Sequence, residues 1–109
     1  MSNDILQKLM ATIVARKGAA VESSYVAKLF SNGEDAILKK VGEETTEVLL
    51  AAKSGDKQHL VYETADLWFH CMVLLAQHGL SVNDVLKELE QRTGVSGLDE
   101  KANRKANAF

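Results

Sequence analysis

The sequence predicts an all-α domain of about five helices, built around a central antiparallel helical hairpin. The 109 residues contain no proline, so no proline interrupts a helix from within. Apolar residues recur at helical spacing over long stretches. Most glycines fall between these stretches, where short turns are expected. Together these observations favour long helices joined by tight connections.

Two helices are expected before the hairpin. The first should cover about residues 4–16, where apolar side chains recur every three or four positions, and it should end at Gly18. A shorter second helix is expected over 24–30, with Ser23 or Ser24 as its N-cap.

The central hairpin is predicted from two long periodic segments, 35–53 and 57–77. The sequence between them is Ser54-Gly55-Asp56. Glycine is the usual residue just past a helix end, and aspartate is a strong N-cap for the next helix. These residues therefore predict a tight reversal between two antiparallel helices.

A fifth helix is expected over 82–92. Ser81, with Asp84 three residues later, predicts a capping box at its start. We expect residues 1–97 to form one domain, followed by a charged C-terminal tail over 98–109 that is either a frayed helix or flexible.

Composition excludes several classes of protein. The net charge of −2 gives no strongly basic face, so we expect no nucleic-acid partner. The longest apolar run, 67–76, contains His70 and is too short to span a bilayer, so no membrane contact is expected. The single cysteine, Cys71, fits a reducing compartment, and the N-terminus lacks signal-peptide character. The sequence thus predicts a cytoplasmic protein.

Four carboxylates carry the functional prediction. Glu44 and Glu47 lie on the third helix, and Glu63 and Asp66 lie on the fourth. The two pairs stand eight and eleven residues on either side of Gly55. In an antiparallel hairpin, equal distances from the turn are level, here roughly 12–16 Å from it. The sequence therefore predicts that the two pairs face each other.

Facing carboxylates favour a divalent cation. Like charges near 4 Å repel by several kcal/mol at moderate dielectric, and oxygen ligands suit Mg²⁺ or Mn²⁺. A Glu-x-x-Glu pair such as Glu44/Glu47 is common on solvated helix faces, so it is weak evidence for a metal site by itself. Glu63 and Asp66, however, lie in the most apolar helix of the chain. We therefore predict a metal site formed by Glu44, Glu47, Glu63 and Asp66.

A carboxylate-bound magnesium ion typically accepts substrate phosphates, which predicts cleavage of a nucleotide polyphosphate. Glu47 or Glu43 is the expected base for the attacking water, so Glu43, Glu44 and Glu47 are the catalytic candidates. Lys40, Lys39 and Arg92 are candidates to bind phosphate, although surface cations are often only solvated.

Two further features leave alternatives open. His70 lies one turn after Asp66 and is either a partner of the metal-binding carboxylates or a satisfied core histidine. The fourth helix is apolar around most of its circumference, which predicts that it is largely buried. Part of that burial should come from a second subunit, in a homodimer whose two hairpins form a four-helix bundle.

The residues also resemble a known family. Lys39-Lys40-Val41-Gly42-Glu43-Glu44, followed by Glu47 and by Glu63-Thr64-Ala65-Asp66, resembles the signature of the all-α NTP pyrophosphatase (MazG-like) superfamily. The run 24–30, Gly33 and the stretch 65–75 narrow the resemblance to the phosphoribosyl-ATP pyrophosphatases. It covers about residues 5 to 105, including the tail around 96–104.

That resemblance implies hydrolysis of phosphoribosyl-ATP to phosphoribosyl-AMP and pyrophosphate, the second step of L-histidine biosynthesis. It implies a small-molecule phosphoribosyl-nucleotide substrate, Mg²⁺, an obligate homodimer and metal ligands among the four carboxylates, with Glu43 as an accessory. Tyr25, in the matching 24–30 run, joins the substrate-binding candidates. Some family members are fused to the cyclohydrolase that acts next; this chain has no room for it, so we expect the stand-alone form.

Three rival interpretations remain at the level of sequence. One is a house-cleaning pyrophosphatase for noncanonical (d)NTPs in the same superfamily. Another is a di-iron carboxylate bundle, which expects Glu-x-x-His pairs that neither acidic pair provides. The last is a non-catalytic helical dimerisation module, which predicts that Glu44→Gln and Asp66→Asn leave activity and the response to Mg²⁺ unchanged.

Overall fold

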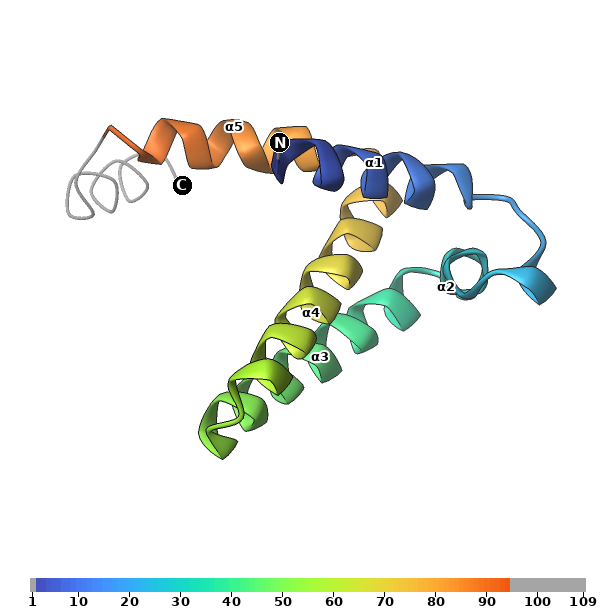
Figure 1. Cartoon of the computed structure of the whole chain (residues 1–109). Coiled ribbons are helices and arrows are strands. Elements are labelled where there is room, and N and C mark those ends of the chain that lie inside the picture. The colour runs from blue at the N-terminus through green and yellow to red at the C-terminus, as the bar shows by residue number, and fades with distance from the viewer. Residues whose placement is uncertain (1, 95–109) are drawn as a thin grey trace, which may run out of the picture.

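The computed structural model describes the backbone of residues 2–94 and the side chains of residues 5–94. The predicted tail over 98–109 and the domain boundary at 97 lie outside the described residues. The described chain is all-α and has no strand, as predicted (Figure 1). In order, its elements are α1 (Ser2–Ala15), a short 3-10 helix η1 (Val21–Ser23), α2 (Tyr25–Asn32), α3 (Glu34–Ser54), α4 (Lys57–Gln77) and α5 (Val82–Arg92).

Helix boundaries follow the local capping chemistry. The bounds of α4 and α5 are those predicted, and α3 extends one residue further at each end. Helix α2 runs two residues beyond its predicted end because Gly33 closes it. The Gly33 N–H donates to the carbonyls of Leu29 and Phe30 at 3.2 Å each, and its φ of 95° is a conformation that favours glycine.

The hairpin is the centre of the fold. Helices α3 and α4 run antiparallel and pack along their length (Figure 1). Between them Gly55 has a left-handed φ of 81°, and its N–H donates to the Ala52 carbonyl at 3.3 Å. The Asp56 side chain then accepts the His59 N–H at 3.0 Å and caps α4. The predicted turn is therefore confirmed.

Helices α1 and α5 lie across the end of the hairpin opposite this turn (Figure 1). The predicted capping box is present: Ser81 and Asp84 each accept a backbone N–H at the start of α5. The buried apolar core gathers at this end, and α1, α2, α3, α4 and the start of α5 all contribute to it. Its members are Met10, Ile13, Leu29, Ile37, Met72, Val73, Ala76 and Val82.

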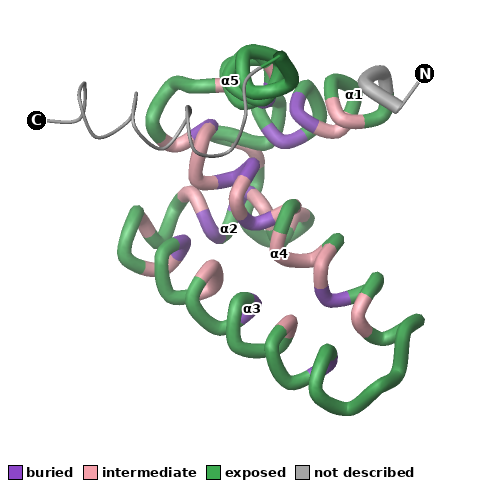
Figure 2. The backbone as a smooth tube through the Cα atoms, turned by 90° about the vertical axis from the view of Figure 1, so that its left-hand side faces the viewer, coloured by how far each residue is buried: buried purple, intermediate pink, exposed green. Residues whose placement is uncertain are grey.

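The rest of the hairpin is thinly covered (Figure 2). The radius of gyration is 16.0 Å, whereas a compact domain of this length has about 13 Å. Val61 is 70% and Trp68 is 58% exposed, so the expectation that α4 is buried around most of its circumference is wrong for this chain by itself. Thr45 and Ala52 of α3 are also exposed, because no described element covers that side of the helix.

No helix among the described residues is long and apolar enough to cross a membrane. The length of α4 would suffice, but its sequence mixes charged and polar residues with apolar ones.

Candidate metal and phosphate site

The site is centred on Glu44 of α3 and Asp66 of α4. Each lies eleven residues from Gly55, and the antiparallel hairpin brings them face to face as the sequence predicts. One potential ligand atom from each of Glu44, Asp66 and His70 lies within 4.8 Å of the others. Glu44 is only 7% exposed and His70 is buried, whereas Asp66 is half-buried. The hairpin thus holds a largely buried acidic cluster.

The Glu44 carboxylate lacks the partners that a buried anion needs. Its Oε1 atom is buried without a hydrogen-bond partner among the described residues, and its Oε2 atom lies 3.6 Å from Lys40 Nζ. Burial raises the pKa of Glu44, and the neighbouring Asp66 carboxyl raises it further, against the opposing effects of Lys40 and His70. A hard cation bound by both carboxylates would satisfy the orphaned oxygen and remove the repulsion.

His70 is a hydrogen-bonded core histidine in this arrangement, not an available ligand. Its Nδ1 lies 2.8 Å from the Asp66 carbonyl oxygen, and its Nε2 lies 2.8 Å from the Tyr25 hydroxyl. A carbonyl only accepts, so Nδ1 must carry a proton and cannot offer a lone pair to a metal. His70 therefore connects Asp66 of α4 to Tyr25 of α2.

Tyr25 brings α2 to the edge of the acidic cluster. Its ring meets that of His70 edge-on, with centroids 5.8 Å apart. Burial raises the pKa of the Tyr25 phenol; Lys40 opposes the rise, and the Asp66 and Glu44 carboxylates add to it. The hydroxyl lies 2.8 Å from His70 Nε2, and His70 Nδ1 lies 3.4 Å from the Asp66 carboxylate, so the phenol lies close to the candidate site. The α2 run that carried the family resemblance therefore reaches the carboxylates.

Lys40 is the cation of the cluster. Its Nζ atom lies 3.5 Å from Glu43 and 3.6 Å from Glu44. Burial would lower the pKa of Lys40, but Tyr25, Glu43 and Glu44 together raise it, so the ammonium stays charged. Lys39, next to it, is exposed.

Arg92, the remaining cationic candidate, lies in the last turn of α5. Its Nε donates to Glu88 at 3.2 Å.

The other two predicted metal ligands, Glu47 and Glu63, lie outside the close group formed by Glu44 and Asp66. Glu47 is exposed, one turn along α3 from Glu44. Glu63 is buried, and its Oε2 lies 3.0 Å from His59 Nε2, one turn earlier in α4. The sequence reasoning missed His59, although its spacing of four residues from Glu63 could have revealed the contact. Neither Glu47 nor Glu63 joins Glu44 and Asp66 in the close group.

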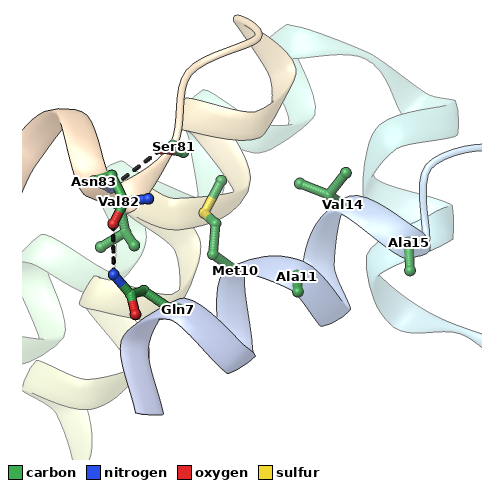
Figure 3. Close-up of a pocket in the computed structure, with 8 residues that line it drawn as sticks. All are labelled: Gln7, Met10, Ala11, Val14, Ala15, Ser81, Val82 and Asn83. Carbon is green, nitrogen blue, oxygen red and sulfur yellow. Dashed lines mark hydrogen bonds between the residues drawn. The ribbon is translucent and has the colours of Figure 1, made fainter. Parts of the chain in front are cut away.

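Recesses elsewhere have a different chemistry. One of about 370 Å³ lies between α1 and the start of α5, where Gln7 donates to Asn83 at 2.8 Å (Figure 3). Its lining has no charged side chain, and a second recess of about 310 Å³ near Trp68 is lined by apolar residues and Cys71. Neither suits a metal ion or a polyphosphate.

Comparison with known proteins gives a consistent result. The family profile described as phosphoribosyl-ATP pyrophosphohydrolase matches residues 6–93. A Chromobacterium violaceum protein named phosphoribosyl-ATP pyrophosphatase is 60% identical over 108 residues, covering 99% of this chain and all of the relative. Proteins of the same name from Nitrosospira multiformis and Methylococcus capsulatus are 63% and 56% identical, over 94% of this chain and 85% and 97% of the relatives. The chain therefore belongs to the phosphoribosyl-ATP pyrophosphohydrolase family.

Proposed function

We propose that this protein hydrolyses phosphoribosyl-ATP to phosphoribosyl-AMP and pyrophosphate, the second step of L-histidine biosynthesis, with Mg²⁺ as its cofactor. The single observation that carries the proposal is the opposed pair Glu44 and Asp66, with a buried Glu44 oxygen that has no hydrogen-bond partner among the described residues. The names of the relatives supply the substrate.

Glu44 and Asp66 would hold the cation, and Glu47 and Glu63 are the further ligand candidates, each one turn away along its helix. When bound, Mg²⁺ neutralises phosphate charge and makes the phosphorus easier to attack. Mn²⁺ has the same preference for oxygen ligands and should substitute.

The chain's own residues supply the remaining roles. Lys40 is held beside Glu43 and Glu44 and would meet phosphate oxygens that the cation leaves uncompensated. Lys39 and Arg92 are the weaker candidates for the same task. A water oxygen attacks phosphorus, the anhydride bond breaks, and pyrophosphate leaves. Exposed Glu47 or Glu43 would accept the proton of that water.

Assembly as a homodimer belongs to the same proposal. Large apolar side chains stand exposed along the hairpin, and a second hairpin would cover them in a four-helix bundle. We place the reaction in the cytoplasm, which suits a chain with one unpaired cysteine.

Steady-state release of pyrophosphate from phosphoribosyl-ATP, with and without Mg²⁺, tests the function. Wild-type protein should turn over only with the cation. Glu44→Gln and Asp66→Asn should each lower kcat/KM by at least about a hundredfold, as loss of a metal ligand does. Glu90→Gln and Asp35→Asn are matched controls because both residues are exposed on helix surfaces, and they should leave turnover unchanged.

Competing substrates sharpen the test. Equal or better turnover of dCTP, dUTP or ITP would favour a house-cleaning pyrophosphatase over the histidine pathway. Full activity in folded Glu44→Gln and Asp66→Asn proteins would instead support a non-catalytic helical module.

A further inference from the structure

His70 joins two helices through both of its ring nitrogens. It is 3% exposed, and its neighbours on either side are the Tyr25 hydroxyl and the Asp66 carbonyl, each at 2.8 Å. Phe69 meets the imidazole edge-on at 5.4 Å between ring centroids, which further restricts the ring. A side chain confined in this way can fix the position and the hydrogen-bond direction of its exposed partner.

The direction follows from counting protons. A neutral imidazole has one N–H, and Nδ1 must carry it because the Asp66 carbonyl can only accept. When His70 is neutral, Nε2 is therefore an acceptor and the Tyr25 hydroxyl donates to it. The phenol proton is therefore already used, and only the lone pairs of the Tyr25 oxygen remain for a ligand.

Tyr25 also faces open space. The residue is 51% exposed and lines a recess of about 310 Å³ together with Arg16, Ser23 and Phe69. The Tyr25 hydroxyl lies 2.8 Å from His70 Nε2, and His70 Nδ1 lies 3.4 Å from the Asp66 carboxylate, so the phenol also borders the acidic cluster. Tyr25 therefore has both an exposed surface and, through His70, a link to the Asp66 carboxylate.

We propose that His70 is a positioning residue that fixes the Tyr25 oxygen as a hydrogen-bond acceptor for an O–H donor of the bound substrate or of a water beside it. Phosphate oxygens are acceptors at neutral pH, so this oxygen does not bind phosphate; that task falls to the cations. The substrate part of this inference rests on the proposed function, whereas the hydrogen-bond arrangement does not.

The arrangement is tested first in the metal-free protein without substrate. Long-range ¹H–¹⁵N correlation spectra at mildly alkaline pH report which nitrogen of each of the three histidines is protonated. His70 should show a protonated Nδ1 and an unprotonated Nε2. The Nε2 resonance should shift in Tyr25→Phe and stay in place in Tyr62→Phe, the matched control for the only other tyrosine. A proton on Nε2 of His70 would overturn the proposal.

Kinetics then test the positioning role. Tyr25→Phe should lower kcat/KM for phosphoribosyl-ATP about five- to tenfold, the loss expected for one hydrogen bond. His70→Asn should lose as much, because its amide is too short to reach the phenol. His70→Gln can place its amide near the Nε2 position and should recover most of the activity. His78→Gln, at an exposed histidine paired with Glu34, should be neutral.

The double variant separates positioning from a purely structural effect. If His70 acts through Tyr25, then His70→Asn should cost little more in the Tyr25→Phe background. Additive losses of kcat/KM in the double variant would refute the positioning role of His70. Equal losses in His70→Gln and His70→Asn proteins of matched thermal stability would also refute it. If His70→Asn does not fold, the same test of additivity is made with Tyr25→Phe, His70→Gln and their double variant.

Kinetics with a second substrate, ATP, identify the group that donates its O–H to the Tyr25 oxygen. A Tyr25→Phe loss seen with phosphoribosyl-ATP and absent with ATP assigns the donor to a phosphoribosyl hydroxyl. A loss shared by both substrates assigns it to a group common to both, such as water. No loss with either substrate would overturn the acceptor role. If wild-type protein turned over neither substrate, the proposed function would fail while the spectra still decided the tautomer.

Discussion

At the scale of single residues, Glu44 shows how a binding site opposes stability. The side chain is buried beside Asp66, and one of its oxygens has no hydrogen-bond partner among the described residues. A carboxylate placed there for packing alone would be replaced to advantage by a neutral residue. Its location makes sense when a cation completes the site, because the same burial then strengthens the attraction between metal and ligand.

Replacing Glu44 should therefore stabilise the metal-free protein. The folded-state pKa of Glu44 is raised above its ordinary value of 4.5, so its stability contribution is full below that pH and is lost as pH rises through the folded pKa. Glu44→Gln should unfold at higher denaturant than wild type at neutral pH, by about 1–2 kcal/mol. The difference should vanish in acid. Lower stability of Glu44→Gln at neutral pH would contradict this account.

Added Mg²⁺ supplies the control for that comparison. It should raise the melting temperature of wild-type protein and leave that of Glu44→Gln nearly unchanged, because ligand binding stabilises only the state that binds. Asp35→Asn, at an exposed carboxylate on the same helix, should respond to the cation as wild type does.

At the scale of helices, the turn between α3 and α4 fixes the site. Every residue of the hairpin is located by its distance from Gly55, and Glu44 and Asp66 meet because they are equally far from it. A tight reversal needs a left-handed residue at the end of α3, and Gly55 supplies it without a Cβ penalty. The register of the carboxylates thus depends on a residue that carries no side chain.

Two glycine-to-alanine variants separate backbone strain from helix propensity. Gly55→Ala should lower the free energy of unfolding by about 1 kcal/mol, since its φ of 81° strains any other L residue. Gly42→Ala, within α3, should raise it by about 0.5–1 kcal/mol, since alanine favours helix. An added Cβ meets no atom within 4 Å at either position. Urea unfolding measures both, and a neutral Gly55→Ala would contradict the strain argument.

At the scale of the whole molecule, the exposed faces of the hairpin lead us to expect a second subunit. Its core lies at one end of the hairpin, and the rest of α3 and α4 presents apolar side chains such as Leu49, Val61 and Trp68 to solvent. Exposed apolar area of this extent marks an interface in most water-soluble folds. A second hairpin would cover it and would also shield the acidic cluster from bulk water.

Sedimentation equilibrium should therefore find a dimer of the 11.9 kDa chain. Trp68→Lys should shift the mass toward the monomer at micromolar concentration, because a buried charge without a partner disfavours an apolar interface. Leu80→Lys is the control, since Leu80 is also exposed but lies beyond the hairpin. A monomeric wild type, or a Trp68→Lys protein that remains fully dimeric, would contradict the bundle.

What the sequence by itself determined was local. The ends of α4 and α5, the reversal at Gly55, the capping box at Ser81 and the level meeting of Glu44 with Asp66 follow from short-range rules. Capping, backbone conformation and helical rise depend only on residues a few positions apart. They can therefore be predicted from the amino-acid sequence.

Only the tertiary structure decided which distant side chains meet. Tyr25 binds His70 across 45 residues because α2 packs against the hairpin, and no spacing rule links those positions. Apolar side chains on α3 and α4 that are typical of a core are exposed in the structure. The sequence identifies the apolar face of each helix, but it does not identify the surface that packs against that face.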